Sequence, residues 1–245
     1  MGTNADVVAG DSPEDVRAAL AAALRPLTTE RPAPKGMAPA EIQARIDALG
    51  LPLNVTWPAD AKKVMIFVSG DGGWQDLDAG VTTILAAHGV AVVGWSSLSY
   101  FWEEKTEEQF RTDLRRLLDA LPDGVEVIAG GYSFGAEIIP IALQGTPVGS
   151  EARVGRFALI APGQYAAFEV HPTDWLHPEH APSKWSVPDA LRLQSRPSLC
   201  IKATDETDTG CPDGVSSVKI AAHGGGHHFD GDYPWLADAI LGFAR

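Results

Sequence analysis

The sequence has 245 residues, 32 acidic and 19 basic side chains, and a formal net charge of −13. Its 45% apolar and 21% charged content is typical of a globular chain that can bury a full core. The acidic balance argues against binding to nucleic acid and against broad adsorption to anionic lipid, since both attract a basic face. No stretch approaches the roughly 20 apolar residues that cross a bilayer, so no transmembrane segment is predicted. The opening segment, MGTNADVVAGDSPED, lacks the basic start and apolar core of a signal peptide.

Residues 1–52 are predicted to form a helical appendage with a linker. The segment SPEDVRAALAAALRPL begins with a helix-capping residue, Ser12, followed by Pro13 in the first turn. Three prolines in RPAPKGMAP predict a linker. The segment AEIQARIDALG then predicts a second short helix that ends at Gly50. The rest of the chain, 53–245, is predicted to be one α/β domain.

From residue 53 onward, apolar runs alternate with amphipathic segments. Strands are predicted over 62–70, 90–97, 125–133, 155–163, 197–204 and 217–225, and helices over 78–89, 106–122, 136–144 and 233–244. Continuous apolar runs are typical of strands that are buried on both faces. The pattern therefore predicts the α/β class, with a mostly parallel sheet covered by helices on both faces. A proline-rich stretch, HPTDWLHPEHAPSKW, is too long for a tight connection and predicts a lid around 163–190.

The third predicted strand leads into a Gly-x-Ser-x-Gly motif, Gly131 to Gly135. Chance alone gives this motif roughly 0.1 times in a chain of this length, so its context matters. A buried strand before it and a helix after it are the setting of a nucleophile elbow, the turn that carries the serine of α/β-hydrolases. Ser133 is then the nucleophile, and the backbone N–H of Phe134 stabilises a developing oxyanion. The alternative is an unreactive strand-to-helix turn.

A serine nucleophile needs a histidine base, and α/β-hydrolases carry it after the last strand. The segment HGGGHHFDGDY supplies His223, His227 and His228 at that position. His223 stands too near the strand, and His228 is expected to pack behind the site, so His227 is the preferred base. The alternative is a metal site built from these histidines and the neighbouring aspartates, but no helical two-histidine spacing supports it. No metal site is therefore predicted.

The base in turn needs an orienting acid, which α/β-hydrolases place between the serine and the histidine. The segment ATDETD follows the fifth predicted strand. Its usual alignment favours Glu206, while the spacing to a following proline favours Asp208; both stay candidates, with Asp205 third. Cys200 and Cys211 flank this loop, and they either form a disulfide that braces the acid or are unrelated thiols.

The loop after the first predicted core strand, SGDGGW, should supply a second oxyanion donor. The backbone of Asp71 or of Gly72 is the expected donor, because a glycine-rich loop can approach a substrate oxygen closely. Three aromatic residues, Trp74, Tyr100 and Trp102, either form an apolar wall for the substrate or belong to the core.

Five motifs together, SGDGGW, GWSSLSYFW, GYSFGAEIIP, CIKATDETDTGCP and GGGHHFDGDYPWLA, resemble the VirJ/AcvB family of bacterial virulence-associated hydrolases. The resemblance runs from about residue 51 to the end. It implies an α/β-hydrolase fold and a periplasmic location, reached after removal of a leader that precedes this chain. It also implies hydrolysis of the aminoacyl ester of aminoacyl-phosphatidylglycerol, lysyl or alanyl. The two cysteines fit that compartment, and Glu137 stands where the family often has aspartate.

An aminoacyl ester carries an ammonium group beside its scissile carbonyl. Asp71 and Glu137 flank the predicted elbow and oxyanion loop, so each is either a partner for that ammonium or an ordinary surface charge. The resulting interpretation is a serine esterase that needs no cofactor and acts on an aminoacyl-phospholipid at a membrane surface. Two rivals remain: a general carboxylesterase or peptidase, and a non-catalytic adaptor that recruits envelope or secretion-system proteins.

Overall fold

The structure is a computed structural model that describes residues 37–168 and 185–245. These residues belong to one compact unit, Met37–Arg245. The first predicted helix and most of the HPTDWLHPEHAPSKW stretch lie outside the described residues.

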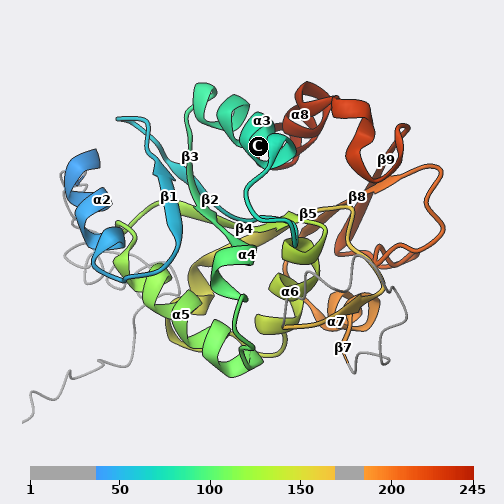
Figure 1. Ribbon diagram of the computed structural model, residues 1–245, viewed down its shortest axis with the longest axis horizontal. Helices are drawn as coiled ribbons and strands as arrows, with labels where there is room; N and C mark the ends of the chain where they lie inside the picture. The colour runs from blue at the N-terminus through green and yellow to red at the C-terminus, as the bar shows by residue number, and fades with distance from the viewer. Residues whose placement is uncertain (1–36, 169–184) are drawn as a thin grey trace, which may run out of the picture. The chain divides into compact units, whose positions relative to one another are not determined.

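A seven-stranded sheet forms the centre of this unit, in the order β1-β3-β2-β4-β5-β8-β9 (Figure 1). Its strands are β1 (Leu53–Thr56), β2 (Lys63–Val68), β3 (Val90–Trp95), β4 (Glu126–Tyr132), β5 (Val154–Ile160), β8 (Ser198–Ala203) and β9 (Val218–His223). Every neighbouring pair is parallel except β1 with β3. The carboxyl ends of the six parallel strands therefore meet at one edge, where loops from different parts of the sequence converge.

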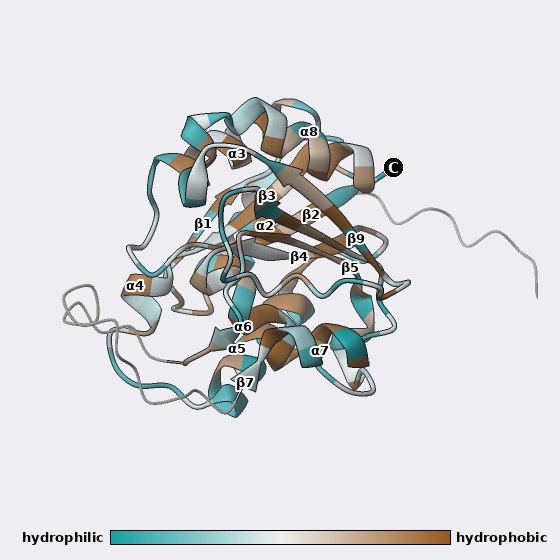
Figure 2. Cartoon of the chain, turned by 90° about the vertical axis from the view of Figure 1, so that its right-hand side faces the viewer, coloured by the Kyte–Doolittle hydropathy of each residue, from teal (hydrophilic) through white to brown (hydrophobic). Residues whose placement is uncertain are grey.

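Helices cover both faces of the sheet, as Figures 1 and 2 show. One face carries α3 (Asp76–Ala87) and α8 (Tyr233–Phe243), and the other carries α5 (Glu107–Ala120), α6 (Phe134–Ala142) and α7 (Val187–Leu193). Two hydrophobic cores result, one on each side, and brown apolar residues concentrate in the strands between the helical layers in Figure 2. The predicted fold class, an α/β-hydrolase fold with helices on both faces, is confirmed.

The helix α5 illustrates how local sequence signals produce this layer. The Thr106 hydroxyl accepts a bond from the Gln109 N–H at 3.1 Å, and the Gln109 side chain accepts one from the Thr106 N–H at 2.7 Å. This reciprocal cap satisfies two backbone donors that the helix start leaves unpaired. The buried residues of α5 are Phe110, Leu114, Leu117 and Leu118. They recur at helical spacing, so a single apolar face packs on the sheet.

The amino-terminal part of this unit differs from the predicted division at residue 52. The helix α2 (Pro39–Asp47) buries Ile42 and Ile46 in the core on the α5 side, each only 1% exposed. The Arg116 guanidinium also donates to the Leu49 carbonyl at 3.1 Å. The compact unit therefore begins at Met37, because α2 shares a core with the sheet rather than forming an appendage.

The sequence patterns missed several short elements. The strand β1 has only four residues and alternates in burial, so it lacks the continuous apolar run that marks the other strands. A second, two-stranded sheet pairs β6 (Tyr165–Ala166) with β7 (Trp185–Ser186). Both strands lie within the predicted lid segment, of which the structure describes only these flanks. The lid itself stays a prediction.

Candidate active site

Ser133 occupies the sharp turn between β4 and α6, with φ of 50° and ψ of −118°. Few residues other than glycine adopt such a conformation, and it must be held by its surroundings. The Ser133 N–H donates to the Ile160 carbonyl at 2.8 Å, and the Ser133 carbonyl accepts from the Glu137 N–H at 3.1 Å. The first bond ties the turn to β5 and the second starts α6, so both neighbouring elements fix the serine.

The two glycines of the motif are required by close backbone packing. A Cβ on Gly131 or on Gly135 would overlap the carbonyl oxygen of Val68 in β2. Because that atom belongs to a central strand, it cannot move aside. The motif thus reflects how tightly the elbow packs on the sheet, and the same packing lifts Ser133 to the carboxyl edge.

Three side chains far apart in the sequence meet at that edge. The Nε2 atom of His227 lies 2.9 Å from the Oγ atom of Ser133, and the Nδ1 atom of His227 lies 2.6 Å from a carboxylate oxygen of Glu206. The Glu206 carboxylate can only accept, so Nδ1 carries the proton and Nε2 is left as the acceptor for the serine hydroxyl. The side chains of His227 and Glu206 are 39% and 25% exposed, so the site is open to a substrate. This arrangement can activate a serine for attack on a carbonyl carbon.

The other acid candidates lie elsewhere. Asp208 is exposed, and among the hydrogen bonds of the described residues none joins it to His227. Asp205 accepts the Gly226 N–H at 3.2 Å, so it supports the loop that carries His227. The geometry therefore favours Glu206 over Asp208.

The other two histidines have different partners. His223 lies 3.2 Å from an Asp232 carboxylate oxygen, and its ring stacks on Trp235 with centroids 4.3 Å apart. The Nδ1 atom of His228 lies 2.9 Å from the hydroxyl of Tyr132. Within 37–168 and 185–245, no group of three or more histidine, cysteine or acidic residues is placed to hold a metal ion.

The predicted oxyanion donors come from two segments, the start of α6 and the loop after β2. Phe134 is the first residue of α6, so its N–H has no acceptor within the helix. In the opposite loop, Gly70 lies close to Ser133, since a Cβ built on it would lie 3.9 Å from the Ser133 Cβ. The Gly72 N–H donates to the Asp71 side chain at 2.8 Å, so the predicted donor Gly72 has an acceptor within the loop.

Two buried serines that the sequence patterns did not single out hold this loop. The hydroxyl of Ser69 lies 3.1 Å from the Gly70 carbonyl, and the hydroxyl of Ser97 also donates to that carbonyl. The two hydroxyls are 2.9 Å apart. The loop is thus held by the segment that follows β3. Ser69 and Ser97 stand in the motifs SGDGGW and GWSSLSYFW, but no pattern in those motifs marked either serine as a loop anchor.

The three predicted wall aromatics do not come together. Trp74 packs on the α3 side, with its ring centroid 6.0 Å from that of Phe67. Tyr100 is a core residue of the opposite side, 7% exposed, and its hydroxyl donates to Asp113 at 2.7 Å. Trp102 is 65% exposed. The sheet separates the first two, so these residues do not form one substrate wall.

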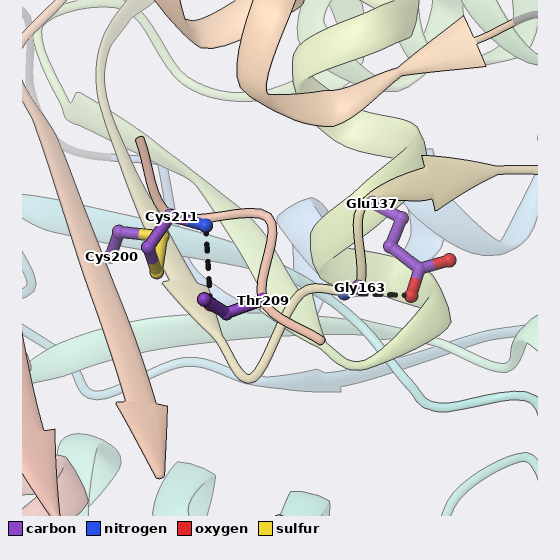
Figure 3. Close-up of a disulfide and its surroundings, with 5 residues drawn as sticks. All are labelled: Glu137, Gly163, Cys200, Thr209 and Cys211. Carbon is purple, nitrogen blue, oxygen red and sulfur yellow. Dashed lines mark hydrogen bonds between the residues drawn. A yellow bond between two sulfur atoms is a disulfide. The ribbon is translucent and has the colours of Figure 1, made fainter. Parts of the chain in front are cut away.

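Glu137 lies in the first turn of α6, one turn after Ser133. Its carboxylate accepts the Gly163 N–H at 3.0 Å (Figure 3). The pKa of this carboxyl is raised to about 7, with burial as the main cause; the bond from Gly163 acts against the rise, and the carboxylates of Asp71 and Asp208 add to it. The negative charges of Asp71 and Asp208 therefore act on the Glu137 carboxyl, so the electrostatic potential there is negative.

The predicted disulfide between Cys200 and Cys211 is confirmed (Figure 3). It closes the loop that carries Glu206. The Cys211 N–H donates to the Thr209 hydroxyl at 3.2 Å, and the Gly210 N–H donates to the Pro162 carbonyl at 2.6 Å. The end of this loop is therefore tied both to β8 and to the segment that contacts Glu137.

Comparison with solved structures shows the same fold. A hydrolase from Oleispira antarctica aligns with a TM-score of 0.59 and 15% identity over 81% of this chain and 96% of that one. The thioesterase domain from the curacin biosynthetic pathway aligns with a TM-score of 0.54 and 15% identity over 77% and 94%. Est1E from Butyrivibrio proteoclasticus aligns with a TM-score of 0.51 and 13% identity over 78% and 93%. Identities this low establish the α/β-hydrolase fold and no more.

Comparison with curated proteins found no match. Comparison with protein families matches residues 62–245 to the family described as "Bacterial virulence protein (VirJ)". The matched range contains the elbow, the Glu206 loop and the His227 loop, and it covers most of the chain. The chain therefore belongs to the VirJ family of bacterial virulence proteins.

Proposed function

We propose that this protein is a serine esterase, and the contacts among Ser133, His227 and Glu206 carry the proposal. The Ser133 hydroxyl attacks the ester carbonyl carbon while His227 Nε2 takes its proton. The Glu206 carboxylate holds the imidazole through Nδ1 and stabilises the imidazolium that forms. A relay of this kind requires both contacts at hydrogen-bond length, and they measure 2.9 and 2.6 Å.

The remaining steps use the same groups. The tetrahedral oxyanion accepts bonds from the Phe134 N–H and from the Asp71 segment of the opposite loop. His227 then gives its proton to the leaving alcohol, and the acyl group stays on Ser133. A water molecule, deprotonated by His227, releases the acid and restores the serine.

The proposed substrate is the aminoacyl ester of aminoacyl-phosphatidylglycerol, which would yield phosphatidylglycerol and a free amino acid. Its ammonium lies one carbon from the scissile carbonyl, so the group that recognises it must lie close to Ser133. Glu137 meets that condition, with the carboxylates of Asp71 and Asp208 nearby. The resemblance of the five sequence motifs to the VirJ/AcvB family implies the same substrate class.

The proposed location is the periplasm, where this substrate is exposed at the outer face of the inner membrane. The Cys200–Cys211 disulfide supports it, because such bonds persist in oxidising compartments. Within the part of the chain that the structure describes, no helix has the length and apolar character to span a membrane. Access to a lipid ester then requires binding at the membrane surface.

A fluorophosphonate probe tests the mechanism. The wild type should be labelled, and Ser133→Ala should not, with an unchanged unfolding midpoint. Purified lysyl- and alanyl-phosphatidylglycerol then test the substrate, beside a neutral ester of similar chain length. A labelled enzyme that prefers the neutral ester is a general carboxylesterase, and an unlabelled wild type with an intact biological role is an adaptor.

Glu137→Gln tests the ammonium partner. The change keeps the acceptor for the Gly163 N–H and removes the charge. We expect a raised Michaelis constant for aminoacyl esters and unchanged values for neutral esters. An equal loss on both substrates contradicts this role for Glu137.

A further inference from the structure

The side chain of Tyr132 links the parts of the proposed site. Tyr132 ends β4 directly before Ser133, and it is only 6% exposed. Its hydroxyl lies 3.2 Å from the backbone carbonyl of His227 and 2.9 Å from Nδ1 of His228. Its ring also supports the oxyanion loop, since a Cβ on Gly70 would lie 3.2 Å from its Cδ1. One side chain therefore contacts both the loop of the base and the loop opposite the nucleophile.

The two hydroxyl contacts together determine the direction of the hydrogen bonds. A phenol has one proton, and the His227 carbonyl can only accept, so Tyr132 donates to it. The hydroxyl oxygen must then accept from His228, which requires a proton on Nδ1 of that imidazole. Burial raises the pKa of Tyr132, so its hydroxyl keeps the proton that it donates. The chain of bonds runs from His228 to Tyr132 to the backbone of His227.

The loop that carries His227 needs such an anchor. It is a short 3₁₀ segment, η3 (Gly226–Gly231), and it contains two residues other than glycine with positive φ, Phe229 at 53° and Asp230 at 49°. Left-handed conformations of such residues are unfavourable unless the surroundings hold them. Phe229 is fully buried, which anchors the far end of the loop. The bond from Tyr132 anchors the near end, at the residue whose ring faces Ser133.

We propose that Tyr132 and His228 form a clamp that positions His227 against Ser133. Both are positioning residues, because neither contacts the serine hydroxyl. The clamp thus connects the loop of the base to the strand that carries the nucleophile through one side chain. This inference rests on the proposed Ser133–His227–Glu206 triad.

The rate of inactivation by a fluorophosphonate measures the clamp, because it depends on activation of Ser133 rather than on substrate recognition. Tyr132→Phe keeps the ring and removes the hydroxyl, and we expect the rate to fall about three- to tenfold, as for loss of one hydrogen bond. With a saturating ester substrate, kcat should fall by the same factor while KM is unchanged. Tyr233→Phe, which removes a phenol hydroxyl from α8, is the matched control and should leave the rate unchanged.

Variants of His228 separate the clamp from a general structural effect. His228→Asn retains a side-chain N–H near the position of Nδ1, so it should keep the wild-type rate within about twofold. His228→Leu cannot donate and should lose about two- to threefold. In a Tyr132→Phe background, His228→Leu should cause no further loss, because its partner is already absent. Independent losses that multiply, or an unchanged rate in Tyr132→Phe, overturn the clamp.

Imidazole NMR spectra give a readout that needs no turnover. In the wild type, the Nδ1 proton of His227 bonded to Glu206 should appear as a distinct downfield signal, and Tyr132→Phe should broaden or shift it. If Tyr132→Phe does not fold, the comparison of His228→Asn with His228→Leu decides. If the wild type does not react with the fluorophosphonate, the proposed triad is wrong. Independently of that result, an unchanged His227 signal in Tyr132→Phe shows that the clamp is wrong.

Discussion

Replacement of Glu137 by glutamine should stabilise the folded protein at alkaline pH. Glu137 has its pKa raised from 4.5 to about 7 in the folded protein, with burial as the main cause. Between pH 4.5 and about pH 7, the folded protein therefore keeps a proton on Glu137 that the unfolded chain has released. Stability falls as pH rises through this window, and the full penalty applies above about pH 7. At pH 4 both states are protonated, and the penalty is absent.

The magnitude follows from the shift. A difference of about 2.5 pKa units, from 4.5 to about 7, corresponds to about 3 kcal/mol at 1.36 kcal/mol per unit. Because the side chain retains partial exposure, this is an upper value. Glutamine keeps the bond from the Gly163 N–H, so the variant should exceed the wild type by up to about 3 kcal/mol at pH 8.

Urea unfolding at pH 4 and pH 8 measures this difference directly. The two proteins should have equal free energies of unfolding at pH 4 and diverge at pH 8. Glu103→Gln, at an 86% exposed carboxylate, is the control and should show no such divergence. The reasoning is refuted if Glu137→Gln is less stable than the wild type at pH 8. It is also refuted if the free energy of unfolding differs from that of the wild type by the same amount at pH 4 and pH 8. Stabilisation together with a raised Michaelis constant would indicate a carboxylate kept for function.

Three further changes have expected outcomes. Glu206→Gln should lower kcat by about 10³- to 10⁴-fold in ester hydrolysis, because the neutral amide does not stabilise the imidazolium and can donate to Nδ1, which favours the wrong tautomer of His227. Asp208→Asn, at an exposed carboxylate, should stay within about twofold, and equal losses contradict the assignment. Replacing Cys200 and Cys211 by serine should lower the free energy of unfolding by about 3 kcal/mol, because the bridge closes a loop with a sequence separation of 11. Calorimetry under reducing and oxidising conditions checks this, and an unfolding temperature that is the same with and without reductant contradicts it. Ile42→Ala should destabilise the compact unit by about 2–5 kcal/mol in denaturant unfolding, since its side chain is 1% exposed, and a neutral effect would place α2 outside the core.

The features that local patterns predict are those that repeat along the chain. Apolar runs identified six of the seven strands of the main sheet. Five of these six have mostly buried residues and little polar alternation, while the edge strand β9 has no fully buried residue. The one that escaped, β1, is four residues long and half exposed. The Gly-x-Ser-x-Gly motif identified the elbow, because a Cβ at Gly131 or at Gly135 would overlap the backbone carbonyl of Val68. The order serine, acid, histidine followed from strand order, since parallel strands bring their carboxyl ends to one edge.

The sequence by itself thus determined the fold class and the family, while the pairing of Cys200 with Cys211 and the distances between side chains were decided only by the tertiary structure. Spacing left Glu206 and Asp208 as equal candidates, and only the path of the braced loop brought Glu206 within 2.6 Å of His227. Composition could not show that Trp74 and Tyr100 lie on opposite faces of the sheet. It also could not show that α2 packs into the hydrophobic core on the α5 side of the sheet. The bond from Tyr132 to His227 spans 95 residues. Such contacts depend on loop conformations set by packing from many segments at once, which no local pattern records.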